Sequence, residues 1–132
     1  MAEFGARAVA FRRDEDLGTE YLVLAENQDG SGERLEFQRA LIITDDDRRL
    51  GLDTYCLVNE RGVTHYSGVE GWSLTGSLLE IKLDQDAAQE LGIEGGYSIH
   101  LADPEKRADE VTVGLRAILG SPWQPDDSKA RN

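Results

Sequence analysis

The stretch "YLVLAENQDGSGERLEFQRALII", residues 21–43, holds two apolar segments separated by a polar turn. The first segment, residues 21–26, is apolar and includes an aromatic and a β-branched residue, which favour a strand. The second alternates, because Leu35 and Phe37 face one way while the polar residues between them face the other. Residues 27–33 contain two glycines and several turn formers. This stretch therefore predicts two antiparallel strands joined by a hairpin loop.

Strand patterns continue on both sides of this hairpin. They are short, contain alternating apolar residues, and are separated by glycine or by polar turns. Arg61 and Gly62 form a plausible tight turn between two of them. The further strands predicted are 6–13, 52–60, 61–68, one on each side of Gly76, and 97–102.

Two segments have helical signals at their ends. Residues 85–91 follow an aspartate that can cap a helix and precede Gly92, which can end one. The second helix begins with Asp103 as its expected cap and Pro104 at its first position. Its apolar residues recur at helical spacing as far as Leu119.

These elements predict an α+β protein with a mainly antiparallel sheet of about seven or eight strands. The short helix near 85–91 interrupts the strands, and the C-terminal helix packs on the apolar face of the sheet. Residues 1–120 are expected to form a single domain. Residues 121–132 contain two prolines and no periodicity, so they are expected to form a flexible tail.

Charge is the strongest global signal in the sequence. The formal net charge is -12. Residues 14–60 contain 13 acidic and 4 basic side chains, which gives -9 for that segment. Such a chain repels nucleic acid and anionic membranes, and it attracts cationic proteins. No apolar run approaches the roughly 20 residues of a membrane helix, and no secretory signal is evident, so a cytoplasmic protein is expected.

The segment "TDDDRRLGLDTYCLV", residues 44–58, concentrates the candidate functional residues. The three consecutive aspartates do not match a calcium loop, which needs carboxylates at alternate positions and a glycine at the sixth. They are expected to form a solvated turn, after which Gly51 adopts a positive φ and the chain enters a strand. No nucleotide-binding, zinc or hydrolase motif occurs, so neither catalysis nor a cofactor or metal is predicted.

Partner binding is the favoured use of this segment. Acidic residues steer a cationic partner, and aromatic residues supply buried contact area. The predicted partner-binding residues are Asp45, Asp46, Asp47, Asp53, Tyr55 and Tyr66, while Trp72 is assigned to the core. One alternative is a small-ligand or enzymatic pocket near Cys56 and His65, which a hairpin would bring close together. Another is pairing of two copies through an exposed strand edge.

A longer stretch resembles the immunity protein 10 family of bacterial polymorphic toxin systems. Its residues 39–93 are "RALIITDDDRRLGLDTYCLVNERGVTHYSGVEGWSLTGSLLEIKLDQDAAQELGI", and the step "LGLDTYC" is its most specific element. The likeness extends over about residues 6–119. It implies a non-enzymatic cytoplasmic protein that neutralises a cognate toxin. No individual binding residue is carried over from the family.

Overall fold

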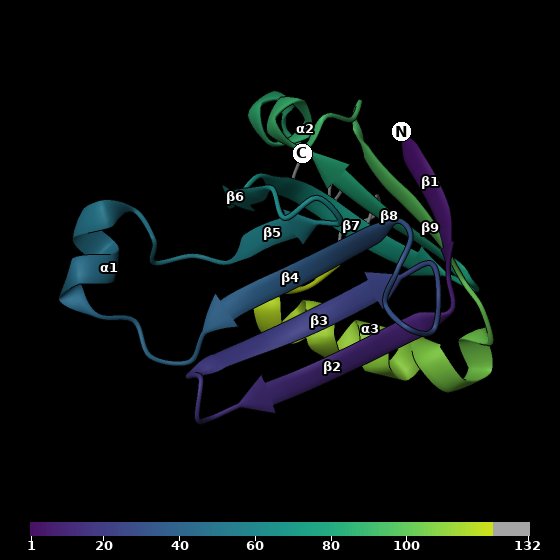
Figure 1. Cartoon of the computed structure of the whole chain (residues 1–132), viewed down its shortest axis with the longest axis horizontal. Helices are drawn as coiled ribbons and strands as arrows, with labels where there is room; N and C mark the ends of the chain where they lie inside the picture. The colour runs from purple at the N-terminus through teal and green to yellow at the C-terminus, as the bar shows by residue number, and fades with distance from the viewer. Residues whose placement is uncertain (123–132) are drawn as a thin grey trace, which may run out of the picture.

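Two β-sheets enclose one hydrophobic core in the computed structural model, which describes residues 1–122 (Figure 1). The larger sheet is antiparallel throughout, with the order β2-β3-β4-β5-β6. Its strands are β2 (Ala8–Asp14), β3 (Thr19–Ala25), β4 (Arg34–Ala40), β5 (Cys56–Asn59) and β6 (Thr64–Tyr66).

The smaller sheet has the order β1-β9-β8-β7. Its strands β7, β8 and β9 are antiparallel, whereas β1 runs parallel to β9. Their bounds are β1 (Ala2–Ala6), β7 (Val69–Thr75), β8 (Leu78–Leu83) and β9 (Gly96–Leu101). The structure is therefore an α+β fold with mainly antiparallel sheets, as predicted.

The chain crosses between the sheets at two corners. Arg7 separates β1 from β2, and Ser67 with Gly68 separates β6 from β7. At the second corner both residues have a positive φ, 61° for Ser67 and 101° for Gly68. A Cβ on Gly68 would lie 2.5 Å from the Cβ of Ala87, so this corner requires glycine for space as well as for conformation.

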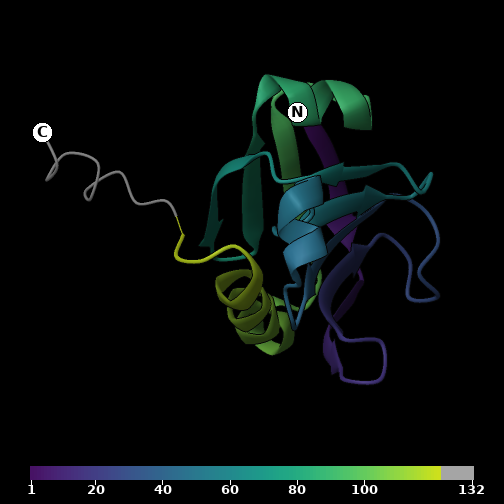
Figure 2. The same cartoon turned by 90° about the vertical axis from the view of Figure 1, so that its left-hand side faces the viewer.

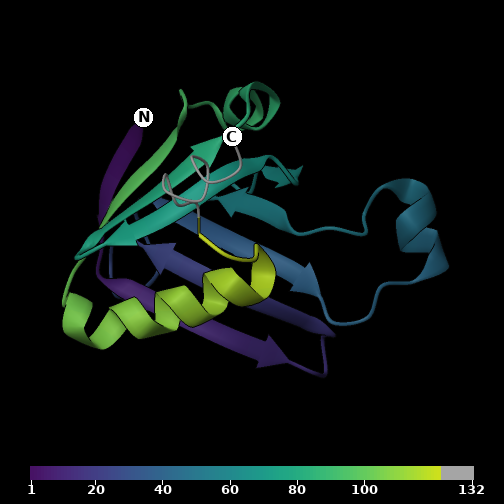
Figure 3. The ribbon, with the colours of Figure 1, turned by 180° about the vertical axis from the view of Figure 1, so that it is seen from behind.

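Helix α3 (Pro104–Ile118) covers the inner face of the larger sheet, across β2, β3 and β4 (Figure 3). Gly114 permits the close approach, because a Cβ there would lie 3.0 Å from the ring of Phe11. The inner face is apolar where it meets the helix. Its fully buried side chains are Leu22, Leu24, Leu35, Phe37 and Leu57, and α3 adds Val111, Leu115 and Ile118.

The opposite, outer face of the larger sheet carries the alternate residues. The strand register aligns them in two rows across the five strands. One row is Ala10, Val23, Glu36, Val58 and Thr64, and the other is Arg12, Tyr21, Gln38, Cys56 and Tyr66. Within residues 1–122, no helix packs on this face (Figures 1 and 2).

Helix α2 (Gln85–Leu91) packs beside β6. Both of its predicted end signals are confirmed, since the Asp84 side chain accepts a hydrogen bond from the Ala87 amide and Gly92 has a φ of 76°. The cap predicted for α3 is only partly present. Asp103 precedes the helix, but its side chain makes no capping hydrogen bond and lies 3.6 Å from the ammonium of Lys106.

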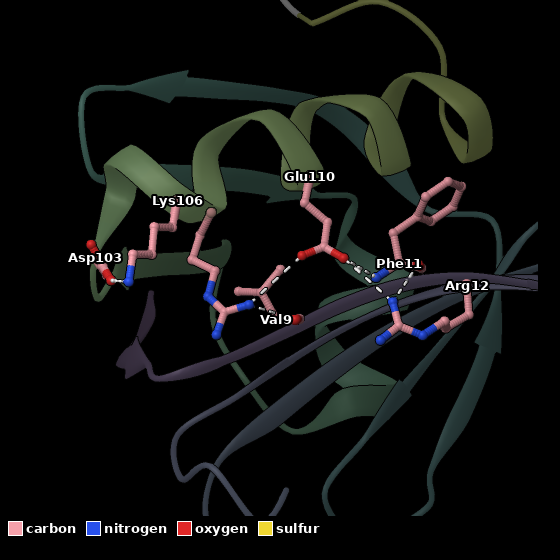
Figure 4. Close-up of polar contacts among 7 residues, drawn as sticks. Val9, Phe11, Arg12, Asp103, Lys106 and Glu110 are labelled. Atoms are coloured by element: carbon pink, nitrogen blue, oxygen red, sulfur yellow. Dashed lines mark hydrogen bonds and ion pairs between the residues drawn. The ribbon is translucent and has the colours of Figure 1, made fainter.

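Polar side chains of α3 occupy the free edge of β2 (Figure 4). A carboxylate oxygen of Glu110 accepts a hydrogen bond from the amide of Phe11 at 3.1 Å. Arg107 donates to the carbonyl of Val9 at 3.4 Å, and Arg12 lies 3.5 Å from Glu110. These contacts use backbone groups that would otherwise be free to pair with another strand. Association of two copies through a strand edge stays a prediction, and it would have to use another edge.

Three element predictions are wrong in detail. The strand expected at 6–13 corresponds to β2, and β1 before it was not predicted, which raises the count of strands within residues 1–122 to nine. The strand expected at 52–60 contains only the residues of β5. The solvated turn expected at the triple aspartate is a helix, α1 (Asp45–Leu50). The tail expected at 121–132 lies, apart from its first two residues, outside the described part of the chain.

Candidate functional site

The connection between β4 and β5 carries five of the six predicted partner-binding residues, all except Tyr66. We call residues 41–55 the α1 arm. No residue of its helix is buried. Figures 1 and 3 show the helix standing away from both sheets, at the end of the larger sheet where β4 finishes and β5 begins. Asp45, Asp46 and Asp53 are exposed to solvent, and Asp47 is half-buried.

Local bonds hold α1 in shape without help from the core. The Thr44 hydroxyl accepts a hydrogen bond from the Asp47 amide, and the Asp47 carboxylate accepts one from the Thr44 amide, each at 3.0 Å. Gly51 ends the helix with a φ of 75°, which confirms its predicted positive φ. A helix of six residues is too short to be stable on propensity alone. These caps explain why a helix forms where a turn was expected.

The charges of the arm are partly neutralised within it. Asp45 pairs with Arg48 at 2.9 Å, and Asp46 pairs with Arg49 at 2.7 Å. Hydrogen bonds from the amide and hydroxyl of Thr44 lower the pKa of Asp47. Four aspartates and two arginines leave the arm with a net charge of -2. Its pairs are exposed, so they contribute little stability and can exchange for partner contacts at small cost.

Tyr55 and Tyr66 have different environments. The Tyr55 hydroxyl accepts a hydrogen bond from the Val69 amide at 2.8 Å, and burial raises the pKa of this phenol. Its ring packs against the core and helps fix the β6–β7 corner. Tyr66 is 39% exposed and lies on the outer face beside Cys56. Because Cys56 begins β5, Tyr66 lies at the sheet end from which the arm emerges.

The structure does not bring Cys56 and His65 together as a catalytic pair. Cys56 aligns with Tyr66, and His65 aligns with the next residue, Leu57, so the two side chains project from opposite faces of the hairpin. The Cys56 thiol lies 3.8 Å from the side-chain oxygen of Gln38, and burial raises its pKa. His65 instead contacts Glu90 of α2 at 3.3 Å. A thiol with a raised pKa is a poor nucleophile at neutral pH.

Within 1–122, no group of three or more His, Cys, Asp or Glu side chains is placed to hold a metal ion. In the same range, every helix is too short or too polar to cross a bilayer. Trp72 is 4% exposed and donates to the carbonyl of Gly120, in agreement with its assignment to the core.

Three surface residues near the site were not predicted from the sequence. Ile42 precedes α1 and Leu50 is its last residue, and they are 78% and 64% exposed. Tyr21 lies on the outer face in the same row as Tyr66. Ile42 belongs to the run "ALII", which resembles the end of a buried strand. The sequence signal that separates Ile42 from a buried strand residue is the capping box formed by Thr44 and Asp47, which begins a helix two residues after Ile42.

A family model described as Immunity protein 10 matches residues 5–109. The chain belongs to the immunity protein 10 family. The matched region includes the last two residues of β1, the remaining strands, the α1 arm, α2 and the first residues of α3. Comparisons with curated proteins and with solved structures find no significant match.

Proposed function

We propose that this protein binds and neutralises a cognate polymorphic toxin with a cationic surface by stoichiometric association. The observation that carries the proposal is membership of the immunity protein 10 family. The distribution of charge supports it, because residues 14–60 hold -9 of the total net charge of -12 and build β3, β4, β5 and their connections. The protein acts by occupying the toxin in the cytoplasm, without chemistry of its own.

The proposed contact includes the α1 arm and Tyr66. The aspartates at 45, 46, 47 and 53 attract the toxin over a distance of about 10 Å at 0.1 M salt. Tyr66 then supplies an aromatic contact close to the base of the arm. Tyr55 serves this contact indirectly, since its hydrogen bond to the Val69 amide holds the corner that follows Tyr66.

Calorimetry against the toxin domain encoded beside this protein tests the proposal. We expect one-to-one binding in the nanomolar range, loss of toxin activity, and an affinity that falls on the order of tenfold as salt is raised from 0.05 to 0.5 M. No heat and no inhibition at micromolar protein would reject an immunity role toward that toxin. Binding that is independent of salt would reject the cationic partner.

Charge reversal locates the contact. Asp45→Lys combined with Asp53→Lys changes the arm by four charges and spares the Asp47 cap. We expect a loss of affinity of at least tenfold. The matched control is Glu105→Lys with Asp109→Lys, which makes the same charge change on exposed positions of α3. Equal effects of the two double variants would show that only total charge matters.

A further inference from the structure

The outer face of the larger sheet is unusually apolar for a surface without a covering element. A sheet side exposed to water normally alternates polar residues with the buried ones. Here the two rows include Ala10, Val23 and Val58, together with the rings of Tyr21 and Tyr66. All five are half-buried or exposed in the folded chain. The face thus offers apolar area that folding leaves in contact with water.

The polar residues of this face are bonded to one another. Arg34 pairs with Glu36 at 2.7 Å, and Glu36 also accepts a hydrogen bond from the Gln38 amide. The side-chain oxygen of Gln38 lies beside the Cys56 thiol. Because these groups already have partners, covering them requires little uncompensated desolvation. The tyrosines and valines around them are left to make contacts with another molecule.

Acidic connections border the face at both ends. At the end of the arm, the β2–β3 turn adds Asp14, Glu15 and Asp16. At the other end lie Glu26, Asp29 and Glu33, in the connection between β3 and β4. Burial, together with the charges of Glu26 and Glu60, raises the pKa of Glu33, so carboxylates are crowded there. An apolar centre with a charged rim is the usual anatomy of a protein interface.

The surface is also hollowed at each end. One hollow is lined by Arg12, Asp14 and Tyr21 beside the β2–β3 turn. The other lies between the connection 26–33 and the sheet, where Ala8, Ala10 and Val23 form its floor. Figure 2 shows this connection on the side of the larger sheet away from α3. The arginines that line the second hollow, Arg7, Arg34 and Arg107, each donate to an acceptor of the protein itself.

We infer that the outer face, with Tyr21 and Tyr66 as its anchors, is the docking surface for a cationic protein, the cognate toxin. The inference rests on the proposed function and extends its contact from the arm across all five strands. Charge complementarity selects this occupant, since the segment that builds most of the face and its borders carries -9. A second copy of the chain would bring the same negative charge and be repelled.

Single variants measured against the wild-type protein test this surface. Tyr21→Ala and Tyr66→Ala should each weaken toxin binding about tenfold or more, as truncation of a central aromatic residue does. Val113→Ala, which removes an exposed apolar side chain from α3, should leave affinity within about twofold. Thr64→Arg is a second probe at an exposed position of the same face, where bulk and positive charge oppose docking without disturbing the core. Thermal melting checks that each variant is folded.

The possible results separate this inference from the proposed function. If the wild-type protein neutralises the toxin but Tyr66→Ala and Thr64→Arg bind as tightly as wild type, the outer face is rejected and the immunity role stands. If the wild-type protein does not bind the toxin, both are rejected. If sedimentation shows a wild-type dimer that Tyr66→Ala dissociates, the face joins two copies and the inferred occupant is wrong.

Discussion

Asn59 links three parts of the molecule through one buried amide. It is 4% exposed, and its side-chain oxygen accepts hydrogen bonds from the amides of Arg61 and Val63, each at 3.0 Å. Its side-chain nitrogen donates to the carbonyl of Leu91 at the end of α2. The β5–β6 turn and α2 therefore depend on the same residue.

Replacing Asn59 should destabilise the whole fold. Asn59→Ala leaves the turn amides and the Leu91 carbonyl without this partner, so we expect the free energy of unfolding to fall by about 2 to 3 kcal/mol. Chemical denaturation measures the change. Glu60→Ala, at the exposed neighbouring position, is the control and should change stability by less than about 0.5 kcal/mol. A similar small change in both variants would mean that the Asn59 hydrogen bonds do not stabilise the fold.

Because of Tyr97, the stability of the fold should depend on pH in the alkaline range. Its ring meets Phe4 edge to face, with centroids 6.3 Å apart, and burial raises its pKa to about 12. The pKa in the unfolded chain is about 10. Since the folded state holds the proton more tightly, the stability from the neutral phenol is full below pH 10 and is lost as the pH rises toward 12.

Tyr97→Phe should remove this part of the pH dependence. The variant keeps the ring contact with Phe4 but has no group to ionise. We expect the unfolding free energy of the wild type to fall by about 1 to 2 kcal/mol more than that of Tyr97→Phe as the pH rises from 8 to 11.5. The curves of the two proteins against pH should therefore converge or cross. Parallel curves for the two proteins would contradict the raised pKa of Tyr97.

Helices α1 and α2 have similar lengths but different relations to the core. Both are capped by a side chain that accepts from a backbone amide, Thr44 for α1 and Asp84 for α2. α2 buries Ala87, Ala88 and Leu91, whereas α1 buries no residue. Loss of a cap should therefore have different consequences in the two helices.

Cap deletions in the two helices test this difference. Asp84→Ala should lower the free energy of global unfolding by about 1 kcal/mol. Thr44→Ala should leave global unfolding within about 0.5 kcal/mol, because the arm can lose its helix while the core stays intact. Amide exchange over residues 45–50 should nevertheless become faster in Thr44→Ala. A large drop in global stability for Thr44→Ala would show that the arm is part of the cooperative fold.

Sequence patterns predicted the elements that bury an apolar face. The β3–β4 hairpin, α2 and α3 each have periodic apolar residues, and their ends carry turn or cap signals. Helix α1 has no apolar stripe to detect, because its shape comes from hydrogen bonds at Thr44, Asp47 and Gly51. The break at Arg7 also left no signal, since the small apolar residues on both sides suit one continuous strand.

The sequence allowed the positions of the charged residues of the candidate site to be predicted, but not the surroundings of its aromatic residues. Exposure of the aspartates follows from their chemistry. The different roles of Tyr55 and Tyr66 depend on the β6–β7 corner, which brings the Val69 amide to the Tyr55 hydroxyl. Alternation placed Tyr21 on the face opposite Leu22, but only the position of α3 decides which of the two faces remains open.

In the whole molecule, most of the negative charge and several surface apolar residues belong to the same segment, residues 14–60. Residues 14–60 carry -9, while all other residues of the chain together carry -3. The same segment supplies Tyr21, Val23 and Val58 on the outer face and Leu50 on the arm. The residues outside this segment include α2, α3 and the smaller sheet, and their net charge is low. The molecule thus has one side suited to a cationic partner.

Hydroxyl-radical footprinting of the protein alone and with its toxin tests the central claim most directly, because it reports the exposure of individual side chains. We expect labelling of Tyr21, Tyr66 and Leu50 to fall severalfold in the complex. Labelling of Val113, on the exposed side of α3, should stay unchanged. Protection of Val113 with Tyr21 and Tyr66 labelled as before would place the toxin on the other side of the molecule and contradict the account.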